Sequence, residues 1–477
     1  MNSDPASFAD VEAAIRVRGV EWEIDPSLDR MQALMDMLGS PQRSYAVIHV
    51  TGTNGKTSTA NMIDTLLRAR GLRTGRYTSP HLASMRERIS VDGEPLGAER
   101  FVAAYAEMVP YVQLADSTGG PPLSFFEVLT AMAFAVFADA PVDVAVVEVG
   151  MGGTWDATNV ADGSVAVVTP ISMDHTRYLG DTIELIATEK AGIIKPGAVA
   201  VLAQQPVEAV QILLRRASEA VASVAREGIE FGILHRDVAL GGQRLTIRGL
   251  RGQYDDLFLP LFGAHQASNA ACALAAVEAF AGVPAGTLWP GGIQPVSDTG
   301  GALDATLVSQ AFAQMASPGR LEVVRRSPTV LVDAAHNPAG MAATVAAVEE
   351  SFAFAPLVGV VAVSADKDVT GILEQLEPVL SEVVVTRNSG ARAMEVPALA
   401  ELAGEIFGPE HVYAAARLDD AVDIAVGLAD AAEADGFGGA AAPGSAGVLI
   451  TGSVATAGEA RLLLTKSGEA ENRRHPG

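Results

Sequence analysis

The segment SYAVIHVTGTNGKTS, residues 44–58, decides how the first part of the chain folds. Its opening residues, 44–50, are almost uninterruptedly apolar and rich in valine and isoleucine, which predicts a buried strand. Apolar residues then recur at helical spacing from Lys56 onward, until Gly71 provides a stop signal. A strand, a glycine-containing turn and a helix N-terminus in succession favour phosphate binding, because free backbone N–H groups and the positive end of the helix face the anion.

The glycine spacing of this turn differs from that of the common phosphate-binding loop. The common pattern is G-x-x-x-x-G-K-[ST], and Val50 stands where its first glycine belongs. One alternative is a helix-capping turn that contains Gly55 and Lys56 by chance. The strand before the turn and the helix after it favour nucleotide binding, with Lys56 as a mobile charge and Thr57 as a hydroxyl ligand of Mg²⁺.

The composition limits the class of protein. A chain of 477 residues exceeds what one core usually supports, so we expect two or three domains. Apolar residues make up 49% and charged residues 19%, which excludes a disordered chain. The net charge of −24 argues against nucleic acid or an anionic membrane as a partner, since both bind basic surfaces. An anionic substrate would need a local basic pocket or metal ions.

The single cysteine and the N-terminal segment indicate the compartment. Cys272 lies within the apolar run ACALAAV and is predicted to pack in the core, so no disulfide forms within the chain. The first residues lack the basic and apolar regions of a signal peptide. No uninterrupted apolar run reaches the roughly 18–20 residues that span a membrane. We therefore expect a soluble, cytoplasmic protein.

Short apolar runs alternate with longer amphipathic segments along the chain. The runs that read as strands are residues 44–50, 142–149, 164–171 and 198–204 in the first part and 329–335, 358–365, 381–387 and 447–453 in the second. This alternation predicts an α/β fold with two open, mainly parallel sheets, each covered by helices on both faces. Such sheets bind ligands beyond the carboxyl ends of their strands.

A segment rich in glycine and proline, residues 289–305, separates the two sets of strands. It lacks clear periodicity, as expected for a connection between domains. We predict an N-terminal domain at residues 1–305, a connection at 306–320 and a smaller C-terminal domain at 321–477.

Polar residues follow several predicted strands of the first part. Glu148 ends an otherwise apolar strand, where a buried carboxylate is costly unless it is paired or bound to metal. His175 follows the next strand, and we favour a metal ligand there over a structural, hydrogen-bonded histidine. Lys190 falls in the last turn of a predicted helix, which fits a site residue and a surface lysine that complements the helix dipole equally well.

Polar residues also follow the strands of the second part. Asp333 and His336 come after its first predicted strand, and the segments at 364–368 and 451–453 come after later ones. Because the carboxyl ends of parallel strands meet at one edge of a sheet, we expect these residues at the working edge.

Together these segments resemble the folylpolyglutamate synthase/dihydrofolate synthase family, within the Mur-ligase group of ATP-dependent amide ligases. The matching stretches are TGTNGKTS (51–58), TSPHL (78–82), SFFEVLTAMAF (124–134), EVGMGGTWDATN (148–159), SMDHTRYLG (172–180), TEKAGIIKPG (188–197), GAHQASNAA (263–271), PGRLEVV (318–324) and DAAHNP (333–338). They occur in the family's order between about residue 28 and residue 465. The family's phosphate loop has the shorter form T-G-T-N-G-K, which accounts for Val50. The resemblance implies a P-loop ATPase-like N-terminal domain, a smaller Rossmann-like C-terminal domain and an active site in the cleft between them.

The resemblance also assigns roles to single residues. Those expected to bind ATP are Thr53, Asn54, Gly55, Lys56, Thr57, Asn269, Arg320 and Asp333. Those expected to bind magnesium, with two ions, are Thr57, Ser79, Glu148 and His175. Lys56, Lys190 and His336 are the expected catalytic residues. Lys190 matches a lysine that is carbamylated in several relatives, which turns an ammonium group into a carboxylate-like metal ligand.

The pterin-containing substrate is expected near two of the matching stretches. Its predicted contacts are Ser124, Phe125, Phe126, Glu127, Trp155, Asp156 and Ala157. The rings of Phe125 and Phe126 are available for stacking, with core packing as the simpler interpretation. The sequence departs from the family where Thr154 and Trp155 replace an Arg-Leu pair, so that one basic contact to the substrate is either lost or replaced. It departs again at Ala334, where the family has glycine.

The resemblance implies an ATP-dependent ligase that adds L-glutamate to a carboxylate through an acyl phosphate. Dihydropteroate and the terminal glutamate of reduced folates both fit as acceptors. Since Arg320 and Asp333 lie at or beyond the predicted boundary, ATP is expected between the domains, so that domain closure assembles the site. We expect a monomer with small-molecule substrates only. The alternatives are another amide ligase of the Mur group, a non-enzymatic nucleotide switch and an ATP-binding structural protein. A switch would have no use for Arg320, Asp333 and His336.

Overall fold

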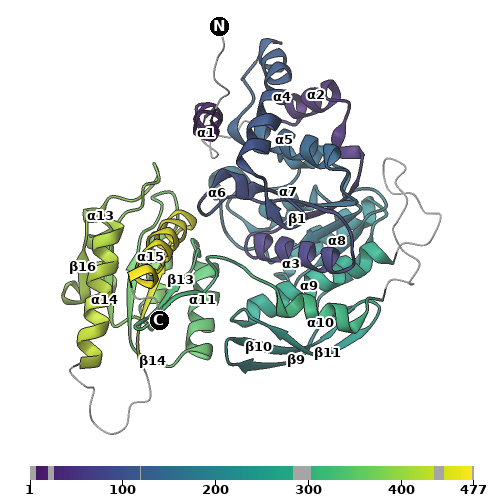
Figure 1. Ribbon diagram of the computed structural model, residues 1–477. Coiled ribbons are helices and arrows are strands. Elements are labelled where there is room, and N and C mark those ends of the chain that lie inside the picture. Colours follow the sequence, from purple (N-terminus) through teal and green to yellow (C-terminus); the bar gives the residue numbers. More distant parts are fainter. Residues whose placement is uncertain (1–6, 20–25, 119, 283–301, 435–444, 475–477) are drawn as a thin grey trace.

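The computed structural model describes residues 7–19, 26–118, 120–282, 302–434 and 445–474. The strands form sheets of eight, three and six members (Figure 1). Within the described ranges no helix is both long and apolar enough to cross a membrane. The predicted α/β fold with two mainly parallel sheets is confirmed. The three-stranded sheet is an addition that the sequence analysis did not predict.

The eight-stranded sheet is parallel apart from one strand. Its order is β4-β3-β2-β5-β1-β6-β7-β8, and only β3 runs against its neighbours. The strands are β1 (Ala46–Thr51), β2 (Thr74–Tyr77), β3 (Ile89–Val91), β4 (Glu94–Pro95), β5 (Val144–Glu148), β6 (Val165–Val168), β7 (Val199–Leu202) and β8 (Ser223–Arg226). Every residue of β1 is buried, because helices cover both faces of the sheet.

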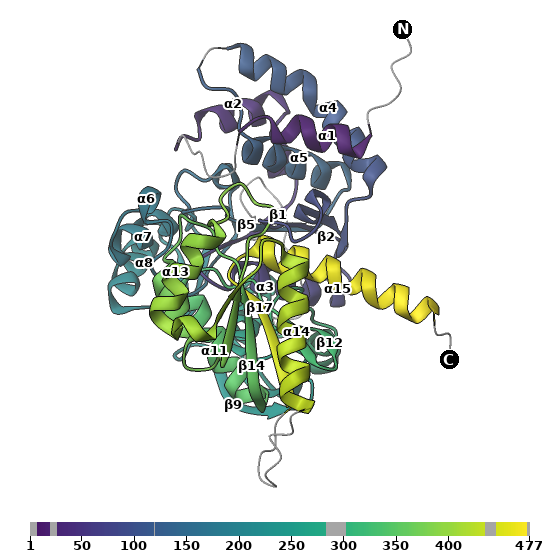
Figure 2. The same cartoon turned by 90° about the vertical axis from the view of Figure 1, so that its left-hand side faces the viewer.

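The helices of the N-terminal part form two layers around this sheet. One layer holds α1 (Phe8–Arg16), α2 (Asp29–Met37), α4 (Ala98–Ser117), α5 (Phe125–Asp139), α6 (Thr176–Leu179), α7 (Ile183–Ala191) and α8 (Val207–Glu219). The opposite layer holds α3 (Lys56–Ala69) and α9 (Ala264–Ala281). Figures 1 and 2 both show α1, α2, α4 and α5 gathered at one end of the molecule, far from the three-stranded sheet. Short 3-10 helices span Pro41–Arg43, Met85–Arg88, Ala157–Val160 and Pro409–His411.

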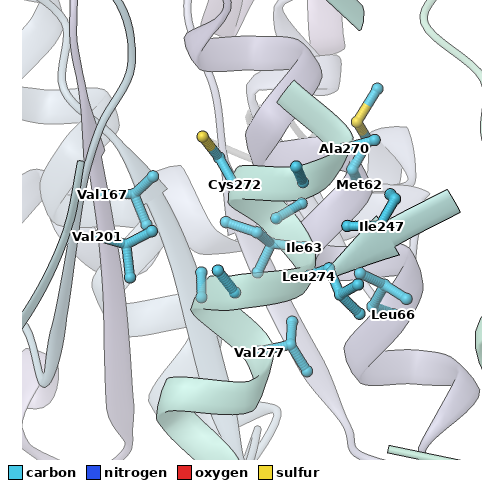
Figure 3. Packing of buried hydrophobic residues seen from close by; sticks show 14 of the residues in the cluster. Met62, Ile63, Leu66, Val167, Val201, Ile247, Ala270, Cys272, Leu274 and Val277 are labelled. Carbon is cyan, nitrogen blue, oxygen red and sulfur yellow. The ribbon is translucent and has the colours of Figure 1, made fainter. Parts of the chain in front are cut away.

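A continuous core lies where α3 and α9 pack on the eight-stranded sheet (Figure 3). Ile63 of α3 and Leu274 of α9 are fully buried there, beside Val167 of β6 and Val201 of β7. α9 is rich in alanine, whose small side chain lets the helix backbone approach its neighbours closely. Cys272 is buried in this core, as the sequence analysis predicted.

A three-stranded antiparallel sheet flanks this core. Its order is β11-β10-β9, with β9 at Gly232–Ala239, β10 at Gly242–Arg248 and β11 at Gln253–Leu259. Leu245 and Ile247 of β10 face the core, whereas much of β9 is exposed. The sequence analysis missed this sheet because its strands are only half-buried and lack the long apolar runs of the parallel strands.

The six-stranded sheet forms the C-terminal part of the molecule. Its order is β12-β13-β17-β14-β15-β16, and only β12 is antiparallel. The strands are β12 (Glu322–Arg326), β13 (Thr329–Val332), β14 (Phe354–Val361), β15 (Glu382–Val385), β16 (Val412–Ala414) and β17 (Ser445–Thr451). One face is covered by α11 (Pro338–Ser351), α12 (Val369–Leu376) and α13 (Val396–Phe407), and the other by α14 (Leu418–Ala434) and α15 (Val454–Arg474).

The chain passes between the two parts after α10 (Ala305–Ala313). α10 packs in the N-terminal core through Val308 and Phe312, whereas Leu321 is the first residue of the C-terminal core. We use "N-terminal part" for residues up to 315 and "C-terminal part" for residues from 321. Most of the glycine-rich segment at 289–305 lies outside the described residues. The predicted boundary stays a prediction, and the packing of α10 favours placing this helix with the N-terminal domain.

The packing of α3 against α9 predicts a large effect of Ile63→Ala on stability. The substitution leaves a cavity in a fully buried core, so the free energy of unfolding should fall by about 2–5 kcal/mol. Val207→Ala at the exposed start of α8 is the control and should change it by less than about 0.5 kcal/mol. Urea unfolding followed by circular dichroism measures both, and equal effects would contradict the assignment of this core.

Candidate active site

The phosphate loop connects β1 to α3 and packs tightly on its neighbours. Gly52 and Gly55 have φ angles of +142° and +88°, which favour glycine. A Cβ atom on Gly52 would lie 1.9 Å from Oγ1 of Thr169, and one on Gly55 would lie 2.4 Å from Oδ1 of Asn269. The backbone N–H of Thr53 donates to the carbonyl of Pro170, 2.9 Å away. The loop is therefore shaped by β6 and α9 as well as by its own sequence.

Two lysines converge on this loop from different helices. Lys56 begins α3 and donates to the carbonyls of Gly52 at 3.2 Å and of Thr53 at 3.1 Å. Lys190 comes from α7 and donates to the same Gly52 carbonyl at 2.7 Å. Burial lowers the pKa of Lys190 to about 7, and the positive charge of Lys56 adds to that effect. The interpretation of Lys190 as a surface lysine at a helix end is therefore wrong, because the residue is buried at the site.

A small cavity lies against the two lysines. Its lining residues are Gly52, Thr53, Lys56, Gly150, Met151, Gly152, Asp174, His175, Leu179 and Lys190. They come from the phosphate loop, from the glycine-rich turn after β5, from the segment after β6 and from α7. The carboxyl ends of three neighbouring strands thus meet at one cavity, as expected for a parallel sheet.

A second cluster forms around Glu148 at the end of β5. Oγ1 of Thr57 donates to one oxygen of this carboxylate at 2.9 Å, and the backbone N–H of Ser79 approaches the other at 3.3 Å. Burial raises the pKa of Glu148 to about 7, even though the charge of Lys56 favours the ionised form. A carboxylate and two hydroxyl-bearing residues supply oxygen ligands, which Mg²⁺ prefers. The predicted ligands Thr57, Ser79 and Glu148 therefore lie together and fit a magnesium ion.

His175 joins a different group of residues. Its Nε2 atom lies 3.8 Å from Oδ2 of Asp174, and His336 of the C-terminal part approaches the same oxygen at 3.8 Å. Burial lowers the pKa of His175 to about 3 and that of His336 to about 4, so both rings are neutral near pH 7. Among the described residues no three histidine, cysteine or acidic side chains form one metal cluster. The structure thus brings three of the four predicted metal ligands together and places the fourth on the Lys190 cavity.

Asp174 is the polar centre at which the two parts of the chain meet. Lys367 of the C-terminal part donates to its Oδ1 at 2.6 Å, and Asn337 donates to its Oδ2 at 3.1 Å. Burial raises the pKa of Asp174, but the surrounding positive charges outweigh this effect and hold the pKa below its usual range. Since both neighbouring histidines are neutral near pH 7, Lys367 carries the charge that balances this carboxylate.

The C-terminal part also contacts the phosphate loop directly. The amide groups of Asn54 and Asn337 exchange hydrogen bonds at 3.2 and 3.0 Å, and Asn337 caps the N-terminus of α11. In addition, the hydroxyl of Ser58 on α3 lies 2.9 Å from that of Ser317, in the connection between the two parts. The sequence analysis named Asn54 but did not assign Asn337 or Lys367 to the site. Their only signal was a position just after a predicted strand.

The residues predicted to contact the nucleotide occupy the junction between the two parts. Asn269 lies against Gly55, and its amide nitrogen donates to Gln266 at 3.2 Å. Burial lowers the pKa of Lys56, and Arg320 lies close enough for its charge to add to that effect. The carboxylate of Asp333 accepts the backbone N–H of Leu321 at 2.9 Å and therefore helps to fix the loop that carries Arg320.

Ala334 fits its position without the freedom of glycine. Its φ angle is outside the left-handed region, and its N–H donates to the carbonyl of Gly319 at 2.9 Å. The left-handed positions of this region are Gly319 and Leu321 instead, with φ angles of +67° and +45°. The replacement of the family's glycine therefore needs no strained backbone at residue 334.

Two stretches near the cavity contain the residues predicted to bind the substrate. Ser124 caps α5 and exchanges hydrogen bonds with Glu127, whose carboxylate also lies 3.2 Å from Arg30. The ring of Phe125 is buried beneath the guanidinium of Arg88, 5.1 Å from the ring centre.

Phe126 differs from its neighbour Phe125 in exposure and position. It is only partly buried and lies beside Tyr77, with 5.9 Å between the ring centres. Its ring also touches the backbone of Gly150, which lines the cavity. Core packing therefore describes Phe125 better than Phe126.

The turn after β5 holds the remaining predicted substrate residues. Asp156 is buried and accepts the backbone N–H groups of Met151 and Thr158, so its carboxylate braces the turn. Ala157 is buried beside it, and Trp155 packs partly exposed in the apolar cluster around α7. Thr154, one of the two departures from the family pattern, donates through its N–H and hydroxyl to the carbonyl of Glu189. It therefore ties the turn to the helix that carries Lys190.

Two protein families match this chain. Residues 124–277 match the Mur ligase middle domain, and residues 319–453 match the Mur ligase glutamate ligase domain. The first match covers α5 to α9 with the turn after β5, and the second covers the six-stranded sheet. The class of protein is defined by a phosphate loop at the edge of one α/β domain and by a second α/β domain that meets it there. The chain is a ligase of the Mur type.

One relative and two solved structures narrow this class. Dihydrofolate synthase/folylpolyglutamate synthase of Mycobacterium tuberculosis is 53% identical over 471 residues, which cover 96% of this chain and 94% of that protein. The structure of Mycobacterium tuberculosis folylpolyglutamate synthase complexed with ADP has a TM-score of 0.88 at 53% identity and covers 96% and 98% of the two chains. Escherichia coli FolC in complex with DHPP and ADP has a TM-score of 0.80 at 28% identity, with 97% and 99% covered. The chain belongs to the dihydrofolate synthase/folylpolyglutamate synthase family.

The close approach of Asn269 to Gly55 predicts that Gly55→Ala weakens nucleotide binding. The added Cβ would collide with the Asn269 amide, so we expect the affinity for Mg²⁺–ADP to fall by about tenfold or more. Gly71→Ala is a matched control, because Gly71 has a similar φ of +82° but no atom within 4 Å of an added Cβ. Isothermal titration calorimetry measures both, and an equal loss in the two variants would contradict the role of the Asn269 contact.

Proposed function

We propose that the protein joins L-glutamate to a carboxylate with the energy of ATP. The acceptors are dihydropteroate, which yields dihydrofolate, and the terminal glutamate of reduced folates, which yields folylpolyglutamates. The observation that carries the proposal is the cavity against Lys56 and Lys190, bounded by the phosphate loop and by the turn that touches Phe126. The names of the relatives and the DHPP and ADP bound to Escherichia coli FolC support the same reaction.

The chemistry follows from the poor leaving group of a carboxylate. An acceptor carboxylate oxygen attacks the γ-phosphorus of ATP, the bond to the bridging oxygen breaks, and ADP leaves with that electron pair. The α-amine of glutamate then attacks the acyl carbon, the bond to phosphate breaks, and the amine loses a proton. Lys56 would stabilise the negative charge that gathers on the transferring phosphoryl group.

The donor set at the end of β5 suits magnesium. We propose that Thr57, Ser79 and Glu148 hold one ion and that His175 and Lys190 serve a second. When bound, Mg²⁺ supplies positive charge that offsets the charge of the phosphate oxygens. The raised pKa of Glu148 is consistent with a site built for a cation, because a nearby cation would keep this buried carboxylate ionised.

The environment of Lys190 supports the proposal that this residue is carbamylated. A lysine adds CO₂ only as a neutral amine, and a pKa of about 7 makes that form abundant at physiological pH. The new N–C bond releases one proton and leaves an anionic carbamate. That anion would lie close to Lys56, because both amines now contact the carbonyl of Gly52.

Substrate and nucleotide would approach the cavity from different elements. We propose that Phe126 and Trp155 offer their partly exposed rings to the pterin. Phe125, Ser124, Glu127, Asp156 and Ala157 would support that surface from behind. On the opposite side Asn269, Arg320, Asp333 and His336 would position the nucleotide between the two parts of the chain. A monomeric, cytoplasmic enzyme remains our prediction.

The reaction predicts that phosphate release depends on the acceptor. Purified protein with ATP, Mg²⁺ and glutamate should release phosphate only when dihydropteroate or tetrahydrofolate is added. Lys56→Ala should lower this turnover by about a hundredfold, since it removes a charge aimed at the transferring group. Comparing both acceptors with and without glutamate separates the two activities. If the protein releases no phosphate with dihydropteroate and none with tetrahydrofolate, the proposed function is refuted.

The environment of Lys190 predicts a carbamate that depends on pH. Between pH 6 and pH 8 the neutral amine should rise from roughly a tenth to roughly nine-tenths, because the pKa is about 7. Nuclear magnetic resonance with ¹³C-labelled bicarbonate should therefore show a carbamate signal that grows with pH. Lys190→Arg should remove this signal, whereas Lys195→Arg, at a partly buried lysine, should keep it. A signal that survives Lys190→Arg would contradict the assignment.

A further inference from the structure

The three-stranded sheet contributes no residue to the cavity at the phosphate loop, yet it contacts the C-terminal part. Arg236 of β9 directs both terminal nitrogens of its guanidinium to the carboxylate of Glu350 on α11, each at 2.5 Å. The Arg236 side chain is 17% exposed and that of Glu350 is 36% exposed. A two-pronged pair of this kind fixes direction as well as distance, unlike a single contact between mobile surface charges.

A buried amide fixes the orientation of Arg236. Its Nε donates to the side-chain oxygen of Gln243 on β10 at 2.5 Å. The amide nitrogen of Gln243 donates in turn to the carbonyls of Leu261 at 2.8 Å and Gly263 at 3.1 Å. Gln243 is 1% exposed, so loss of any partner would leave a buried polar atom unpaired. Arg236 is thereby linked through Gln243 to the segment that precedes α9.

That segment leads directly to the phosphate loop. α9 begins after Gly263, and two turns along it Asn269 lies against Gly55. Gly263 has a φ of +91°, and an added Cβ would lie 2.6 Å from Cβ of Ala347 on α11. α11 therefore packs on the start of α9 at the level of Ala347 and is held by Arg236 one turn further along.

α11 is thus attached to the N-terminal part at both ends. Asn337 at its start contacts Asn54 of the phosphate loop, and Glu350 in its last turn contacts Arg236. The two attachments are separated by about 20 Å, given the rise of roughly 1.5 Å per helical residue. A helix attached only at its start could pivot about that point, whereas two attachments fix the direction of the helix axis. Figures 1 and 2 both show α11 on the side of the C-terminal part that faces the three-stranded sheet.

We propose that Arg236, oriented by Gln243, is a positioning residue of the ligase reaction. It holds the far end of α11 and the start of α9 in one arrangement, so that Asn337 and Asn269 meet the phosphate loop together. Arg236 would thereby hold the two parts in the arrangement in which the reaction takes place. This role rests on the proposed function. It gives the three-stranded sheet a task that the chemistry at the cavity does not require.

The test compares four single substitutions and one double variant in the full-length protein. Arg236→Ala and Glu350→Ala should each lower kcat with saturating ATP, glutamate and dihydropteroate by about fivefold, and the double variant should lose no more than either one. Arg244→Ala is the matched control, because it removes an exposed pair with Asp256 within the same sheet and should leave kcat unchanged. Arg236→Lys should recover only part of the loss, since one ammonium group cannot serve both Glu350 and Gln243.

Hydrogen–deuterium exchange supplies a readout independent of turnover. The amides of α11 should exchange faster in Arg236→Ala than in Arg244→Ala, while the thermal midpoints of the two variants agree. Equal kcat and equal exchange in these two variants would overturn the proposal, and so would losses that multiply in the double variant. An inactive wild-type protein would instead refute the proposed function, and the exchange data would still decide whether Arg236 fixes α11.

Discussion

The charged contact between Asp174 and Lys367 is the interaction on which the arrangement of the site depends. Asp174 follows the central sheet of the N-terminal part, and Lys367 reaches it from the C-terminal part at 2.6 Å. Asn337 binds the same carboxylate and the phosphate loop, so one buried group orients two elements of the C-terminal part. Because an unpaired buried carboxylate is costly, this group favours the joined arrangement over a separated one.

This arrangement would let an acidic protein bind the anionic nucleotide of the proposed reaction. The net charge is −24, yet the groups around the phosphate loop include Lys56, Lys367 and Arg320. The positive charge is therefore local, and it lies where two separately folded sheets meet. Burial gives these groups their chemistry as well, since it leaves Lys190 with a pKa near neutrality and both nearby histidines uncharged.

The sequence predicted the elements with strong local signals and missed the features that depend on distant contacts. β1, the phosphate loop and α3 were readable because apolar spacing, glycine and lysine occur in one short stretch. The three-stranded sheet was missed because its half-buried strands carry a weak pattern. The burial of Lys190 could not be predicted from its helix. The residue spacing of that helix is the same whether Lys190 faces the site or the solvent. The Asp174–Lys367 pair joins residues separated by 193 positions, which no local pattern reveals.

The path of one oxygen atom tests the central claim most directly. If the carboxylate of the acceptor is activated by phosphorylation, dihydropteroate labelled with ¹⁸O in its carboxylate should transfer one labelled oxygen to each phosphate released. Mass spectrometry of that phosphate after reaction with ATP, Mg²⁺ and glutamate measures the transfer. The account predicts one ¹⁸O atom in each phosphate, and phosphate without the label would contradict it.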